Sequence, residues 1–247
     1  MSINEIHTKI ANMFGKYKIP AITNNIKIED LHRWSSEVAK HFNLDEDDFG
    51  KEMSELFWSV AHVQLSLGYA LIARQDCEFP NGTSGTAFKE EDMPNPITLP
   101  EIHFWYHLYN SYECIYRCWE RMASVLKYIC YPQNNNKMYF DQVVNVLDND
   151  GNFNKNPHIE ALKNQIKHWN KAAKARNEIS HGKSSPFRNM CIEGKLSDLL
   201  GMDGLPLGYA NYTINSPRVS LEQVVDKYKK VFPAMKIIVD FIDNIDR

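Results

Sequence analysis

Residues 101–131 read EIHFWYHLYNSYECIYRCWERMASVLKYICY, and their apolar positions decide the fold class. Large apolar side chains recur at steps of three and four, as on a helix that buries one face. Such a seam packs against neighbouring helices at a shallow crossing angle. The stretch therefore predicts the long central helix of a bundle, with a seam formed by Trp105, Leu108, Tyr112, Ile115, Trp119, Met122, Leu126 and Ile129.

Outside this stretch, helix-breaking residues such as proline and glycine separate further segments with helical periodicity. A long helix is expected from the acidic run at 45–48 to before Phe79, and the pairing of Ser220 with Gln223 predicts a capping box at the start of the last helix. Shorter helices are expected over about 3–14, 29–42, 139–147 and 184–200.

No stretch of alternating apolar residues is long enough to predict a sheet. Residues 79–100 are rich in Gly and Pro and predict a long loop, and a glycine-rich connection is expected to reach Pro217. The prediction is an all-α, up-and-down helical bundle with long loops. We expect an N-terminal helical extension over 1–44 and one bundle unit over 45–247.

Residues 176–182 read RNEISHG, the segment best suited to phosphate chemistry. An arginine can hold a phosphate through two parallel hydrogen bonds, and a histidine exchanges protons near neutral pH. The apolar rhythm from Ile159 to Ala173 predicts a helix that ends near Arg176. His181 would then lie just beyond the helix, beside Arg176.

The R-x-x-x-x-H spacing, with an asparagine directly after the arginine, resembles the signature of the HEPN superfamily. Those proteins are all-helical domains, and many are metal-independent endoribonucleases. The resemblance covers 176–181 in motif and about 45–247 in the order of elements. Some HEPN families have a tyrosine after the histidine; this chain has Gly182 there, so tyrosine-dependent regulation is not carried over.

The resemblance implies a catalytic Arg176 and His181, helped by Asn177, in a composite site of a homodimer that cuts RNA. It implies no metal or other cofactor. It also implies a role like that of toxin or defence ribonucleases, with an unseen regulatory or antitoxin partner. The alternative is a non-catalytic HEPN-like dimer that acts as an interaction or ligand-binding module.

Basic residues gather around the motif, and four of them are candidate RNA contacts: Lys171, Lys174, Lys183 and Arg188. A solvated helix face explains these lysines equally well. Ser180 is expected to cap the helix. On the central helix, Arg117 and Glu120 are candidate supports of the site. Glu113 and Glu120 are spaced to form ion pairs with Arg117 within the helix. Such charged residues can also form a solvent-exposed surface or face a dimer partner.

An alternative candidate site, for a metal ion, consists of four residues of the central helix whose side chains commonly bind metals: His103, His107, Cys114 and Cys118. The seven residues from His107 to Cys114 span about 10 Å of helix, so one ion cannot take all four. We expect these side chains to pack between helices and predict no metal site.

The composition is that of an ordinary globular protein. The 247 residues are 43% hydrophobic and carry a net charge of −3, so any RNA contact must be local. Five cysteines in apolar helical pattern favour reduced thiols. With no apolar run of about 20 residues and no signal-peptide pattern at Met1, we expect a cytoplasmic protein that does not enter a membrane.

Overall fold

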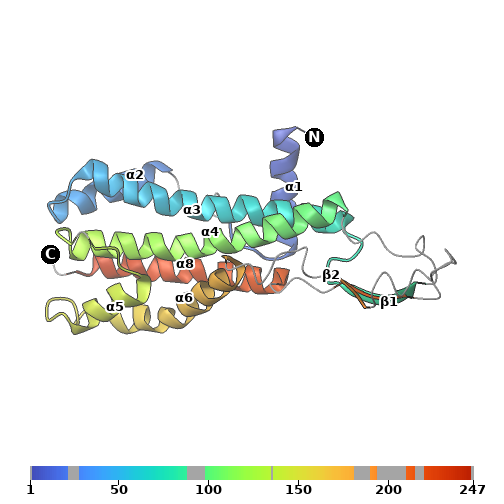
Figure 1. Cartoon of the computed structure of the whole chain (residues 1–247). Coiled ribbons are helices and arrows are strands. Elements are labelled where there is room, and N and C mark those ends of the chain that lie inside the picture. Colours follow the sequence, from blue (N-terminus) through green and yellow to red (C-terminus); the bar gives the residue numbers. More distant parts are fainter. Residues whose placement is uncertain are drawn as a thin grey trace.

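Four long helices form the body of the protein and run alternately in opposite directions (Figure 1). The computed structural model describes residues 2–21, 28–87, 98–134, 136–180, 190–193, 210–214 and 220–245. The long helices are α3 (Glu46–Ala73), α4 (Leu99–Cys130), α6 (Ile159–Ser180) and α8 (Leu221–Asp243). The predicted helical class is confirmed for this body of the protein.

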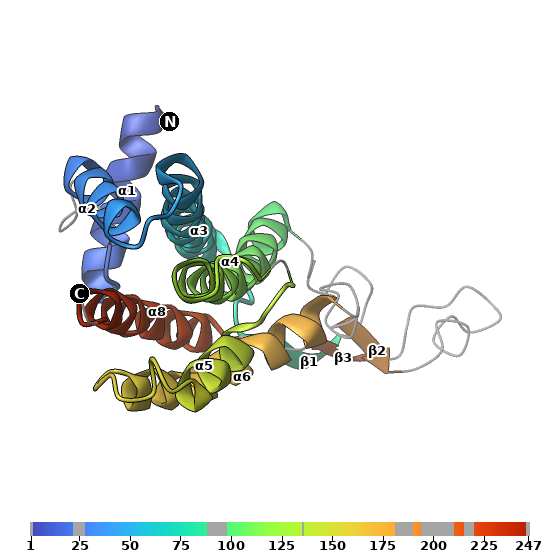
Figure 2. The same cartoon turned by 90° about the vertical axis from the view of Figure 1, so that its left-hand side faces the viewer.

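Helix α4 is the centre of the bundle. It packs against α3, α6, α8 and the short α5 (Phe140–Asn149), which surround it in the end-on view of Figure 2. All eight apolar residues of the predicted seam are buried, and four of them, Leu108, Ile115, Met122 and Leu126, are fully enclosed. The sequence pattern therefore identified the central helix and its buried face correctly.

Helix α3 begins at the predicted acidic run, where the Asp45 side chain accepts a hydrogen bond from the backbone N–H of Asp48 at 2.9 Å. Negative charge in this first turn also offsets the positive end of the helix dipole. A 3₁₀ turn, η2 (Arg74–Asp76), follows α3. Arg74 pairs with Glu222 at 3.4 Å, which joins this end of α3 to the start of α8.

The two N-terminal helices, α1 (Ile3–Lys16) and α2 (Ile28–His41), both pack on α3. Figures 1 and 2 show α1 running across the bundle and α2 lying along α3. Phe14 and Ala39 belong to the same buried cluster as the bundle helices, and Trp34 Nε1 donates to Asp243 of α8 at 3.2 Å. The predicted N-terminal extension thus shares the hydrophobic core of the bundle.

The last helix, α8, begins with the predicted capping box. Ser220 Oγ accepts from the backbone N–H of Gln223, and the Gln223 side chain accepts from the N–H of Ser220. The helix is continuous through Pro233. Its buried positions, which include Val224, Tyr228 and Ile238, complete the core below α4.

A small antiparallel sheet lies at one end of the bundle and shows that the expectation of no strands was wrong (Figure 1). Its strands are β1 (Thr83–Ala87), β2 (Met190–Glu193) and β3 (Ala210–Ile214), in the order β1-β3-β2. They replace part of the predicted 79–100 loop, part of the predicted 184–200 helix and part of the glycine-rich connection. Strand β3 does alternate apolar and polar residues, but over only five positions, which is near the lower end of the length at which alternation is informative.

Candidate phosphate-binding site at Arg176

The motif helix is longer than predicted. Helix α6 continues to Ser180, so Arg176 lies within the helix rather than in its last turn. Ile179 packs against the hydrophobic core and accounts for the extra turn. His181, Lys183 and Arg188 lie outside the described residues, as does the side chain of Ser180.

The Arg176 guanidinium is held on three sides. Its Nε donates to Glu113 Oε2 at 3.4 Å, its Nη1 donates to Asn177 Oδ1 at 3.3 Å, and its Cζ lies 5.1 Å from the centroid of the Tyr116 ring. A guanidinium has five N–H groups, so three remain without a hydrogen-bond partner in the described part of the chain. The Arg176 side chain is 36% exposed.

An aromatic stack anchors the helix that carries Arg176. The Tyr116 ring of α4 stacks on Trp169 of α6 at 5.1 Å, and Trp169 stacks on Tyr139 at 6.0 Å. Trp169 Nε1 also donates to Asp141 of α5 at 3.1 Å. The stack ties α6 to α4 and α5 and thereby fixes the position of Arg176.

Glu120 is connected to this site through Tyr116. Burial and then Glu120, which hydrogen-bonds to Tyr116, raise the pKa of that tyrosine to about 12. Glu120 also pairs with Lys137 at 2.9 Å. Glu120 therefore holds the ring beneath Arg176 and does not itself contact the guanidinium in any interaction described here.

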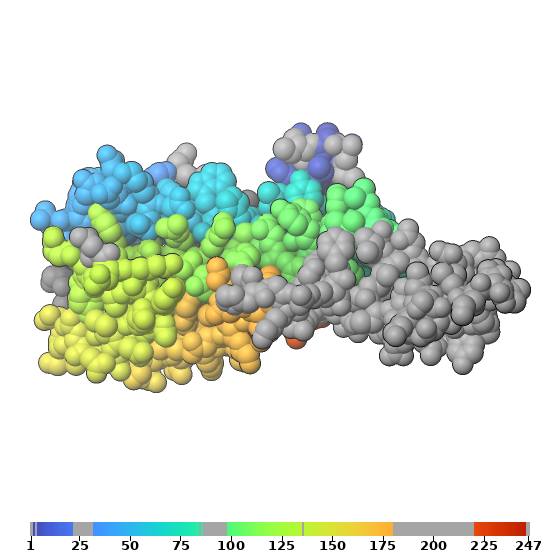
Figure 3. All heavy atoms as spheres, in the orientation of Figure 1, coloured from blue at the N-terminus to red at the C-terminus, as the bar shows by residue number. Residues whose placement is uncertain are grey.

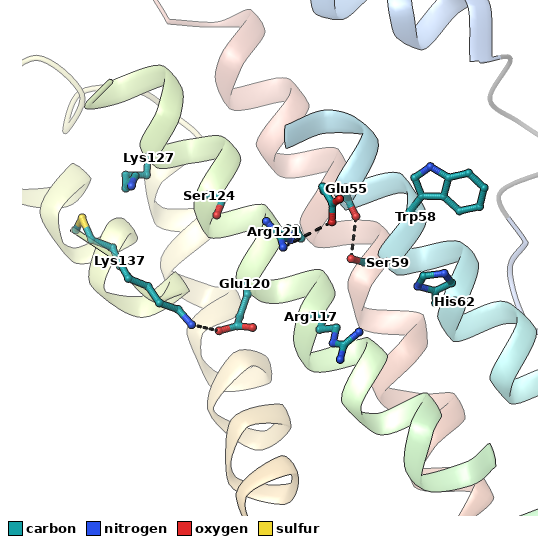
Figure 4. A pocket seen from close by; sticks show the side chains of 11 residues that line it. Glu55, Trp58, Ser59, His62, Arg117, Glu120, Arg121, Ser124, Lys127 and Lys137 are labelled. Carbon is teal, nitrogen blue, oxygen red and sulfur yellow. Dashed lines mark hydrogen bonds and ion pairs between the residues drawn. The ribbon is translucent and has the colours of Figure 1, made fainter. Parts of the chain in front are cut away.

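Arg117 lies elsewhere. It points into a hollow between α3 and α4, on the side of α4 shown in Figure 4. The pairings expected within α4 give way to pairings between elements, because Glu113 contacts Arg176 and Glu120 contacts Lys137. The structure thus brings Glu120 to the site and leaves Arg117 outside it.

The predicted RNA-contacting lysines of α6 do not share a face with Arg176. At about 100° per residue, Lys174 lies roughly 200° and Lys171 roughly 140° around the helix from Arg176. Lys171 approaches α8, where burial and, to a lesser degree, the charge of Lys171 lower the pKa of the half-buried Lys227, while Asp226 raises it. The basic residues of α6 therefore belong to more than one surface.

His107 and the two cysteines of α4, Cys114 and Cys118, pack between helices, whereas His103 is exposed. His107 stacks on Tyr69 of α3 at 5.1 Å, and burial followed by the nearby His103 lowers the pKa of His107. Cys114 and Cys118 are buried free thiols, and burial raises the pKa of each. Within the described ranges, no three His, Cys, Asp or Glu side chains gather as a metal site would need.

Two residues of the Arg176 site were missed by sequence reasoning. Glu113 and Tyr116 lie one turn apart on α4, on the face that meets α6. A polar stripe at 113, 116 and 120, beside the apolar seam, was the only signal of this contact. This stripe does not indicate which helix packs against it.

One described helix has the length and apolar composition of a membrane span. It comprises α3 and its continuation to Asp76, and 56% of its apolar window is buried inside the bundle. Burial of this kind is also what a core helix shows, and one such helix is weak evidence for a membrane span.

Comparison of the chain with protein-family models, with curated proteins and with solved structures finds no match. The resemblance to the HEPN superfamily accordingly rests on the motif at 176–181 and on the helical architecture.

Proposed function

We propose that this protein is a metal-independent endoribonuclease of HEPN-like type, active in the cytoplasm as a homodimer. The observation that supports the proposal is the held guanidinium of Arg176, whose three outer N–H groups have no partner among the described residues. Such a fork matches two oxygens of a phosphate. From the resemblance, a toxin or defence role with a regulatory partner forms part of the same proposal.

In the proposed reaction, His181 takes the proton from a ribose 2′-hydroxyl. The 2′-oxygen attacks the adjacent phosphorus, and the bond from phosphorus to the 5′-oxygen breaks. A protonated histidine returns a proton to that 5′-oxygen. Arg176 neutralises the charge that builds on the phosphate oxygens, and Asn177 orients the guanidinium through the bond at 3.3 Å.

A second copy of the chain gives this reaction its second proton carrier. One His181 provides either an acid or a base at a given moment, and cleavage uses both. A two-fold axis beside α6 would place two Arg176 and His181 pairs near each other, with the same surface on both sides of the interface.

The contacts of Arg176 also favour a second candidate function. Because the guanidinium stacks on Tyr116 and pairs with Glu113, it contributes to packing whether or not RNA is cut. A non-catalytic dimer that binds a phosphate-bearing ligand or a protein partner would keep the same contacts. The two candidates differ in whether His181 is needed for a chemical step.

The test is cleavage of single-stranded RNA in excess chelator by the wild-type protein, Arg176→Ala and His181→Ala, each shown to be folded by circular dichroism. We expect each variant to lose roughly 10²- to 10³-fold in rate. Lys236→Ala, which changes an exposed lysine of α8, is the matched control and should retain full activity. Equal rates for wild type and both variants would remove the nuclease proposal and leave the binding module.

A further inference from the structure

A polar hollow with a volume of about 480 Å³ lies between α3 and α4 (Figure 4). Space-filling Figure 3 shows these two helices side by side on one face of the bundle. The volume falls in the range of small-ligand sites. Its lining combines basic side chains with an exposed aromatic ring, a combination that the Arg176 site does not use.

The positive charge of the hollow comes from two side chains without a carboxylate partner among the described residues. Arg121 is offset by Glu52 and Glu55, at 3.9 and 3.6 Å, and Lys137 is offset by Glu120. Arg117 forms no ion pair in the described ranges, and Lys127 donates only to a backbone carbonyl, that of Asn136, at 3.2 Å. Arg117 and Lys127 therefore leave the hollow with uncompensated positive charge.

The aromatic side of the hollow comes from α3. Trp58 is 59% exposed, which is unusual for the largest apolar side chain, and its ring centroid lies 6.2 Å from that of His62. In Figure 4, Arg117 on α4 and His62 on α3 extend toward each other, with Trp58 one turn away. An exposed ring and an arginine that line the same hollow suit a base and its phosphate, because base stacking and phosphate pairing recur together in single-strand binding sites.

The hollow is joined to the Arg176 site by two shared residues. Lys137 and Glu120 line the hollow and pair with each other, and Glu120 holds Tyr116, the ring under Arg176. Arg176 is also close enough to Lys137 to lower its pKa slightly against the larger opposite effect of Glu120. A strand bound at Arg176 can therefore continue over Lys137 toward Arg117.

We propose that this hollow is a subsite for single-stranded RNA, in which a base stacks on Trp58 and a backbone phosphate pairs with Arg117. The choice of RNA rests on the proposed function, which the subsite deepens by providing a binding track beside the reacting phosphate. A single strand is the expected ligand because a duplex keeps its bases stacked on each other and unable to reach Trp58.

The test measures the affinity of a short, unstructured, fluorescein-labelled RNA by anisotropy in chelator. All proteins carry His181→Ala, so that the RNA stays intact. Adding Trp58→Ala should weaken binding roughly 5- to 100-fold. Adding Arg117→Ala should weaken binding at low salt and reduce the slope of log affinity against log salt by about 0.7. Lys236→Ala, on α8, should leave the affinity unchanged.

The outcomes separate this subsite from the nuclease proposal. If the Trp58 or the Arg117 variant binds the single strand as tightly as its parent, the subsite is overturned. The same holds if the parent shows no binding at low salt, or if a duplex of the same length binds as well. Loss of binding in both variants supports the subsite even if the wild-type protein fails to cleave RNA. If the rate of RNA cleavage is unchanged by Trp58→Ala and by Arg117→Ala, the subsite is overturned and the nuclease proposal stands.

Discussion

At the scale of single residues, Arg176 combines contacts to α4 with partial exposure of its side chain. Its stacking on Tyr116 and its pairing with Glu113 are each worth about 0.5–1 kcal/mol at a partly exposed position. Arg176→Ala should therefore lower the free energy of unfolding by about 1–2 kcal/mol, and Arg176→Lys by less, because the charge remains while the planar stack is lost. Urea unfolding measures both changes.

The control for this prediction is Lys174→Ala, which changes an exposed residue on the opposite side of the same helix. It should alter the free energy of unfolding by no more than about 0.5 kcal/mol. Arg176→Ala with the same stability as Lys174→Ala would show that the contacts with α4 contribute nothing in solution.

His107 should make the fold sensitive to mild acid. Burial and the neighbouring His103 lower its pKa in the folded protein, so the unfolded chain takes up the proton first. The stabilisation by neutral His107 is present above about pH 6.5 and is lost as the pH falls toward the lowered pKa. His107→Phe keeps a ring against Tyr69 but cannot titrate.

Thermal unfolding at about pH 7.5 and about pH 5.5 measures this effect. The fall in Tm between the two conditions should be smaller for His107→Phe than for the wild type, since the carboxylates that also titrate are common to both. An equal fall in the two proteins would show that His107 makes no difference to acid stability.

The partners of Arg176 illustrate what local spacing cannot predict. Glu113 and Arg117 lie one turn apart, so the helix rule pairs them. In the structure Glu113 faces α6 and meets Arg176, 63 residues away. The partner of a charged residue depends on which helix packs against its side of the helix. The sequence indicates that the helices pack together but not in which arrangement.

At the scale of elements, one glycine sets the approach of α1 to α3. A Cβ added at Gly68 would lie 2.7 Å from Ile10 Cγ1 and Cγ2, too close for a real contact. In an exposed helix, Gly→Ala would stabilise by about 1 kcal/mol. Here Gly68→Ala should instead destabilise the protein by about 1–3 kcal/mol, because α1 must shift.

A double-mutant cycle checks this close approach. Ile10→Ala removes the atoms that a new Cβ would meet, so Gly68→Ala should cost less in the Ile10→Ala protein than in the wild type. The free energy of unfolding of the four proteins gives the coupling directly. Strictly additive effects would place α1 farther from Gly68 than the structure does.

The helices could be predicted from the sequence and the strands could not, for a physical reason. The seam of α4 and the capping box at Ser220 are signals contained within a few turns of one helix. The strand β3 pairs with β1, so that Thr83 lies opposite Ile214, and each strand is defined by a partner remote in the chain. The motif helix was predicted too short because the packing of Ile179 is likewise a tertiary contact.

At the scale of the whole molecule, the proposal requires a dimer. With one Arg176 and His181 pair per chain, the second proton carrier comes from a second copy. Light scattering or sedimentation at micromolar concentration should give twice the chain mass of 28.7 kDa. A species of single-chain mass under conditions of full activity would remove the composite site.

If His181 and Arg176 cut RNA through attack of the ribose 2′-hydroxyl, the chemical ends of the fragments are fixed by that reaction. Mass spectrometry of RNA cleaved in excess chelator should find 2′,3′-cyclic phosphate on one fragment and a 5′-hydroxyl on the other, and both should vanish with His181→Ala. Fragments with 3′-hydroxyl and 5′-phosphate ends, or the predicted ends formed equally by the His181→Ala protein, would contradict the account.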